Sequence, residues 1–246
     1  MKFTERMHEF SKIMFVRLEH VKKEVFVQKN AIDNDYPQWK ARRVEFESNY
    51  KKYEARREIF VSIVTLIENA QLSYLLIRDH LTEKSWWDQR LEEVSDDKMR
   101  SVLQEYALMT KWFLLHGLFS VVEETLRSIQ RAAPTEIPVL GRYKSIAKIT
   151  KAILNASDQN KYENLFTLCR FVRNTIHTNG IFLPENTQNI TIEYEEEEFT
   201  FVYGESIDWL NDQKAIWLLL ALANAMNEII RSTKIKDIDY CPRTMV

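Results

Sequence analysis

Apolar residues recur at steps of three or four along most of the chain, which is the spacing of one face of an α-helix. The first such run predicts an amphipathic helix that starts at Phe3 and ends near residues 34–37. Its apolar positions are Phe3, Met7, Phe10, Met14, Leu18, Val21 and Val25. We expect this amino-terminal segment, residues 1–36, to pack on the rest of the helical chain or to extend it.

Residues 38–80 contain no glycine or proline, and Pro37 suits the first turn of a helix, so a second long helical segment is predicted there. Its first half mixes basic and acidic residues, which favours a solvent-exposed surface; a basic ridge for RNA is the alternative. The charged residues are Lys40, Arg42, Arg43, Glu45, Glu47, Lys51, Lys52, Glu54, Arg56, Arg57 and Glu58. From Ile59 the pattern is apolar and predicts that the second half of this segment is buried in the core.

Residues 82–97 are expected to connect to a third long helix over residues 97–132, which stops before a proline. His116 falls in the apolar centre of this helix and is interpreted as a core side chain without a chemical role. Glu123 and Glu124 are interpreted as surface residues. A carboxylate at either position could instead orient a histidine or pair with an arginine on a neighbouring helix.

A loop at residues 134–141 precedes a short predicted helix at residues 143–154. Lys144, Lys148 and Lys151 recur along this helix at helical spacing and form a basic stripe. Such a stripe could extend a phosphate-binding surface, and we predict these lysines as RNA-binding residues. A solubilising surface is the simpler alternative.

Two alternating apolar runs predict a β-hairpin at residues 189–204. The expected cross-strand pairs are Tyr194 with Phe199, Ile192 with Phe201 and Ile190 with Tyr203. The turn falls in four successive glutamates, which lack the glycine or asparagine of a tight turn, so a looser turn is expected. A final helix over residues 206–231 is expected to close the core, and residues 233–246 are expected to form a loosely held tail.

These elements predict a mainly all-α fold, an up-and-down helical bundle over residues 37–232 with one small β-hairpin inserted before the last helix. Four glycines and five prolines in 246 residues agree with long helices and short connections. The net charge is −2, so any contact with RNA must be local. Only Cys169 and Cys241 are present, which makes a disulfide framework or a zinc site unexpected.

A cytoplasmic location without membrane contact is expected. The amino terminus lacks an apolar run of signal-peptide length. The most apolar stretches, residues 112–122 and 215–226, are shorter than the roughly 20 residues that a membrane-spanning helix needs.

The helix predicted at residues 162–180 carries the candidate chemistry. Arg170, Arg173, Asn174 and His177 line up on one face, opposite an apolar face. The apolar positions are Leu165, Leu168, Cys169, Val172 and Ile176. Gly180 is a suitable left-handed cap, so the helix is expected to end with His177 in its last turn.

Cleavage of RNA without a metal needs groups that move protons and a cation that counters charge on the phosphate. Histidine titrates near neutral pH, and the guanidinium of arginine matches phosphate oxygens. Asparagine can hold the imidazole or the sugar. The structural alternative is that these side chains only cap helix carbonyls and bind a neighbouring loop.

The run Arg173-Asn174-Thr175-Ile176-His177-Thr178-Asn179-Gly180, late in a helical chain, resembles the HEPN family (higher eukaryotes and prokaryotes nucleotide-binding domain). The family signature is an arginine, usually followed by a polar residue, with a histidine after a gap of four to six residues. Arg173 has the polar neighbour Asn174 but only three residues before His177, whereas Arg170 has a six-residue gap and is followed by Phe171. Either arginine is therefore a candidate for the motif arginine.

The resemblance implies a metal-independent endoribonuclease without cofactors, in which RNA is cut by its own 2′-hydroxyl to leave a 2′,3′-cyclic phosphate. It also implies a homodimer that brings two copies of His177 into one cleft at the interface. The expected role of such a ribonuclease is that of a toxin or anti-phage defence effector, and an antitoxin or defence-system protein is a candidate partner. The alternative is a catalytically inactive helical module that binds RNA, a nucleotide or a partner protein.

Overall fold

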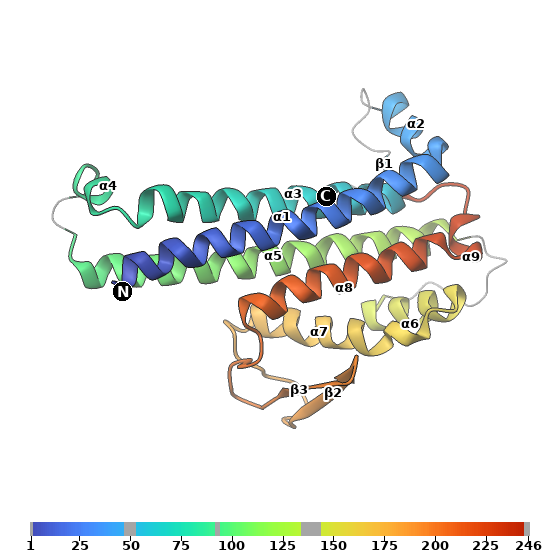
Figure 1. Cartoon of the computed structure of the whole chain (residues 1–246). Coiled ribbons are helices and arrows are strands. Elements are labelled where there is room, and N and C mark those ends of the chain that lie inside the picture. The colour runs from blue at the N-terminus through green and yellow to red at the C-terminus, as the bar shows by residue number, and fades with distance from the viewer. Residues whose placement is uncertain (1, 47–52, 92–93, 134–143, 244–246) are drawn as a thin grey trace.

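The computed structural model describes residues 2–46, 53–91, 94–133 and 144–243, which form mainly α-helix (Figure 1). The four long helices that build the main body are α1 (Phe3–Asp35), α3 (Ala55–Leu76), α5 (Asp96–Ala132) and α8 (Asp212–Arg231). In Figure 1 these helices lie side by side, and α1, α3 and α5 alternate in direction. The predicted mainly helical fold is confirmed.

A second, smaller layer lies below the long helices in Figure 1. It consists of α6 (Ile146–Ser157), α7 (Glu163–His177) and the hairpin of β2 (Ile190–Tyr194) and β3 (Glu197–Phe201). Both α6 and α7 pack on α5, and the Phe199 ring of the hairpin stacks on Trp217 of α8. The remaining short elements are α2 (Pro37–Phe46), β1 (Tyr53–Glu54), η1 (Ile77–Leu81), α4 (Lys84–Asp88), η3 (Asn160–Tyr162), α9 (Thr233–Lys236) and β4 (Pro242–Arg243).

The hydrophobic pattern and the capping residues explain the long helices. The predicted face of α1 is buried at Met14, Leu18, Val21 and Val25. Ser95 begins α5 by accepting a hydrogen bond from the Lys98 amide at 3.2 Å, and Asn211 begins α8 in the same way. Burial of apolar side chains therefore determines which face of a long helix points into the core, and polar capping residues determine where α5 and α8 begin.

The hairpin exists as predicted, but its register and turn differ from the prediction. Ile192 pairs with Phe199, and Ile190 pairs with Phe201. Glu195 and Glu196 have φ angles of 49° and 64°, so they form the tight two-residue turn that the glutamate run argued against. The shift by two residues leaves every side chain on its predicted face of the hairpin, because that face alternates with period two.

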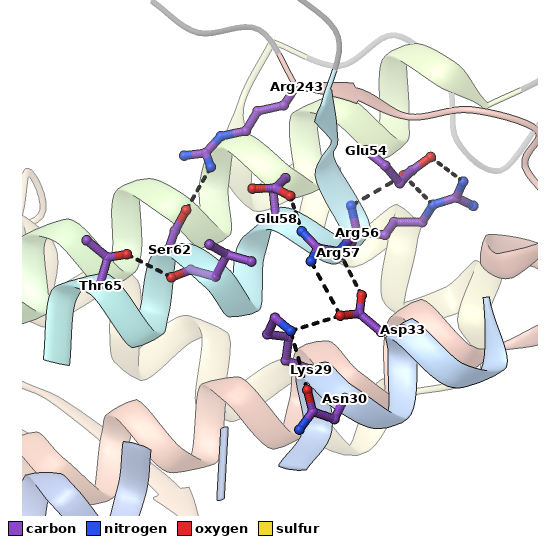
Figure 2. Close-up of polar contacts among 11 residues, drawn as sticks. Lys29, Asn30, Asp33, Glu54, Arg56, Arg57, Glu58, Ser62, Thr65 and Arg243 are labelled. Carbon is purple, nitrogen blue, oxygen red and sulfur yellow. Dashed lines mark hydrogen bonds and ion pairs between the residues drawn. The ribbon is translucent and has the colours of Figure 1, made fainter. Parts of the chain in front are cut away.

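The segment predicted as one helix from residue 38 is interrupted, and part of its predicted exposed charge is buried (Figure 2). A buried charge cluster consists of Asp33, Glu54, Arg56, Arg57 and Glu58. Arg56 and Glu54 form two hydrogen bonds of 2.7 and 2.9 Å, and both side chains are 0% exposed. Arg57 binds Asp33 at 2.7 Å. Of the other bases of the possible ridge, Lys40 is exposed, whereas Arg42, Arg43, Lys51 and Lys52 lie outside the described side chains.

The residues after α8 are packed into the molecule, in contrast to the predicted loose tail. Ile235, Ile238 and Cys241 are buried, and β4 pairs antiparallel with β1. Arg56 also donates hydrogen bonds of 2.8 Å to the carbonyls of Ile235 and Ile238. These carbonyls supply the acceptors that a buried guanidinium needs, so the buried charge cluster and the last described residues stabilise each other.

Residues 55–81 form the one described helix that is long and apolar enough to cross a membrane, a feature that the sequence analysis did not identify. This helix contacts both α1 and α5. Its side chains Ile59, Phe60, Ile63 and Ile67 are at most 1% exposed and belong to the main core. It packs as a core helix of the bundle.

Candidate functional site

Helix α7 has the two faces that its sequence predicts. Leu165, Leu168, Cys169 and Val172 are buried, and Ile176 is half-buried. The helix ends at His177, and Asn179 and Gly180 follow with φ angles of 56° and 88°. The Gly180 amide donates to the Thr175 carbonyl at 2.8 Å, which closes the last turn. The predicted end of the helix is confirmed.

A cavity of about 300 Å³ lies between α5, α6 and α7. Its interior is mainly apolar, and four cationic side chains border it: Lys148 and Lys151 from α6, and Arg170 and Arg173 from α7. The apolar lining residues include Phe119, Val122, Leu126, Ile146, Leu154, Phe166 and Leu222. Predicted site residues that are separated in sequence therefore converge on one concave surface.

Carboxylates hold two of these four cations. Lys151 pairs with Glu163 at 3.0 Å, and Arg173 pairs with Glu123 of α5 at 3.4 Å. Glu123 also binds Arg127 at 2.8 Å, so one carboxylate faces two guanidinium groups. The Arg173 Nε atom is buried and has no hydrogen-bond partner among the described residues. Glu123 therefore orients the Arg173 side chain, and the hydrogen-bonding capacity of this guanidinium is only partly used.

His177 lies beside a second histidine. The rings of His177 and His116 have their centroids 5.1 Å apart and meet edge to face at 89°. His177 is exposed, and His116 is half-buried on α5. Reduced solvation, then the charges of Arg173 and His116, lower the pKa of His177 below its usual value of 6.5. A neutral imidazole is thus favoured at neutral pH.

The predicted site residues fall into two neighbouring groups. Arg170 and Arg173 border the cavity, whereas Asn174 and His177 do not line it and are exposed at the end of α7. Arg173 joins the groups, because it borders the cavity and its charge also acts on His177.

Of the three lysines predicted to form one basic stripe, two lie at the cavity and one does not. Lys148 and Lys151 border the cavity. Lys144 precedes the first residue of α6 and does not line the cavity. The backbone carbonyl of Lys144 accepts a hydrogen bond from Arg127 at 3.1 Å. The predicted helix start at residue 143 was therefore too early, and this removes Lys144 from the stripe.

The sequence predicts no chemical role for His116 and leaves the role of Glu123 open. His116 lies in an apolar stretch, about sixty positions before His177. No local sequence pattern therefore reveals the contact between the two rings. The possibility that a carboxylate at position 123 or 124 pairs with an arginine holds for both residues: Glu123 pairs with Arg173, and Glu124 pairs with Arg243 at 3.2 Å.

Within the described ranges, no group of three or more histidine, cysteine, aspartate or glutamate side chains is arranged to hold a metal ion. Comparisons with protein-family models, curated proteins and solved structures gave no match. The function of this site is therefore inferred from its geometry and from the chemistry of its side chains.

Proposed function

We propose that the protein is a metal-independent endoribonuclease, the activity implied by the resemblance to HEPN proteins. The observation that carries this proposal is the position of Arg173. Its guanidinium borders the cationic cavity and lies one helical turn from His177. A phosphate bound by this guanidinium would lie next to an imidazole that can accept a proton near neutral pH.

In this reaction, neutral His177 removes the proton from the 2′-hydroxyl of the substrate. The freed oxygen attacks the adjacent phosphorus, and Arg173 and Arg170 counter the charge that builds on the phosphate oxygens. Asn174, which is exposed like His177 in the last turn of α7, contacts the sugar in this proposal. The bond to the 5′-oxygen breaks as that oxygen takes up a proton, for which the resemblance implies His177 of a second copy as the donor. The products are a 2′,3′-cyclic phosphate and a 5′-hydroxyl.

The cavity supports the RNA-binding part of the proposal. Lys148 and Arg170 have no ion-pair partner among the described residues, so their charge is available to a phosphate group. The apolar interior behind them has room for an unstacked base, a common mode of recognising single-stranded RNA. Glu123 and Glu163 also line the cavity, so its four cations leave a local excess of two positive charges on a chain whose net charge is −2.

A homodimer is part of the proposal. Met109 and Phe113 are 66% and 63% exposed and precede His116 on α5 at helical spacing. A second copy that covered these apolar side chains would bury them next to the histidine pair. A toxin or defence effector in the cytoplasm, restrained by an antitoxin or other partner protein, is the biological role that this activity suggests.

The activity is tested by incubating the purified full chain with single-stranded RNA in excess EDTA. We expect cleavage products that end in a 2′,3′-cyclic phosphate, because the mechanism moves protons through side chains and needs no metal ion. The chemical end of each product is read by mass spectrometry.

A second candidate, a helical module that binds RNA or a nucleotide without cutting it, is favoured by the largely apolar interior of the cavity. Binding of the same RNA without any cleavage product would support this second function and exclude the ribonuclease.

The two arginines are expected to differ in effect. Arg173→Gln is expected to lower kcat/KM for RNA by about 10²–10³-fold, the usual loss for a group that stabilises charge in the transition state. Arg170→Gln is expected to cost less, because Arg170 lies a further turn away from His177. Initial cleavage rates of the two variants, measured side by side, give the comparison. The reverse order would make Arg170 the motif arginine.

A further inference from the structure

The edge-to-face contact between His116 and His177 joins two helices. The ring of His116 comes from the middle of α5, and that of His177 from the last turn of α7. His177 is exposed and His116 is half-buried, so neither residue is fully enclosed in the core. The nearby charged groups are Arg173 on α7 and Glu123 on α5, which pair with each other. Two imidazoles at this distance hold one proton more readily than two, because two positive charges would repel.

Cleavage of RNA by its 2′-hydroxyl needs one group that takes a proton and another that gives one. We propose that His116 is the second proton-transfer group of this site, so that a single chain supplies both. This inference rests on the proposed ribonuclease function. It replaces the role that the resemblance gives to His177 of a second copy, and it leaves the homodimer itself in place.

The proton balance is complete within the pair. Neutral His177 takes the proton from the 2′-oxygen as that oxygen forms a bond to phosphorus. Protonated His116 gives its proton to the 5′-oxygen as the bond from phosphorus to that oxygen breaks. One proton has then passed from His116 to the product and one from the substrate to His177, and exchange with solvent restores the starting state. The lowered pKa of His177 agrees with its role as the base.

A leaving-group comparison tests the role of His116. His116→Asn is expected to lower kcat/KM for an RNA dinucleotide by about 10²–10⁴-fold, because the 5′-alkoxide leaves poorly without a proton. With uridine 3′-(4-nitrophenyl phosphate), the same variant is expected to stay within about tenfold of wild type, because nitrophenolate leaves without a proton. His177→Ala is expected to be slow with both substrates, since both need the base.

Several outcomes would overturn this assignment. An equal loss of kcat/KM on both substrates in His116→Asn would show that His116 has only a structural role. An unchanged kcat/KM on the dinucleotide would show that His116 takes no part in the reaction. In both cases, cleavage of RNA by the wild type would still support the proposed ribonuclease function. A wild type that cleaves neither substrate would end both proposals.

Mixing the two inactive variants tests whether the pair works within one chain. No mixed dimer of His116→Asn with His177→Ala contains both histidines in the same chain, so we expect no activity beyond that of the separate variants. Recovery of activity on mixing would show that the two groups come from different copies, which contradicts the proposal. His20→Asn, at an exposed position on α1, is the matched control and is expected to behave as wild type.

Discussion

Arg56→Ala is expected to lower the free energy of unfolding by about 3–5 kcal/mol, the usual cost of removing one partner of a buried ion pair. Glu54 is 0% exposed and would keep an uncompensated charge. The carbonyls of Ile235 and Ile238 would lose a common donor, and Trp39 would lose the guanidinium that lies 4.1 Å from its ring centroid. Urea unfolding followed by circular dichroism measures the change.

Two further variants show whether the cost comes from the broken pair. Arg17→Ala removes an exposed arginine of α1 and is expected to change the stability by less than about 0.5 kcal/mol. The double variant Arg56→Met with Glu54→Gln removes both charges and is expected to recover part of the loss. If Arg56→Ala unfolds at the urea concentration of the wild type, the buried charge cluster does not stabilise the fold.

His177→Ala is expected to lower kcat/KM for RNA by about 10²–10⁴-fold, because the base that activates the 2′-hydroxyl is lost. The fold should be retained, since His177 is an exposed residue at the end of α7. A cleavage assay in EDTA measures the loss, and an unchanged urea midpoint confirms that the variant is folded. Cleavage at the wild-type rate would remove His177 from the mechanism.

The dependence of cleavage on pH gives a second measurement of the same group. A base must be neutral, and the pKa of His177 is lowered, so the neutral form persists to more acidic pH. On the acidic side of the pH profile, the kcat/KM of the wild type should therefore fall only below pH 6.5. Arg173→Gln removes a positive charge that lowers this pKa, so the residual activity of that variant should fall at a higher pH than in the wild type.

Features that depend on local pattern were predictable from the sequence. The apolar steps of α1 match its buried face, and Gly180 marks the end of α7, because helix periodicity and left-handed caps are properties of neighbouring residues. The alternation in the hairpin gave the correct faces. Its register could not be found in this way, because it depends on whether Glu195 and Glu196 adopt positive φ angles, which their residue type does not favour.

Features that depend on distant partners were not predictable. Arg56 and Glu58 were expected on a solvated surface, because charged residues near opposite charges usually lie there. The burial of Arg56 requires carbonyls from a distant part of the chain, such as that of Ile238. Glu58 is buried beside Arg57, which also binds Asp33 of α1. The contact of His116 with His177 follows from the packing of α5 against α7, which the pattern of either helix alone does not determine.

The hydrogen bonds from Arg56 to the backbone of residues 235–238 span 179–182 positions of the chain. Most chain ends can detach without disturbing the rest of a protein. Here, release of residues 235–243 would remove the carbonyl acceptors of the buried Arg56 guanidinium and separate β4 from β1. The start of α3 would therefore be destabilised as well. Residues 53–56 and 235–243 are therefore expected to open and close together as one cooperative unit. A polypeptide still being synthesised cannot form all of these hydrogen bonds until residue 238 is available.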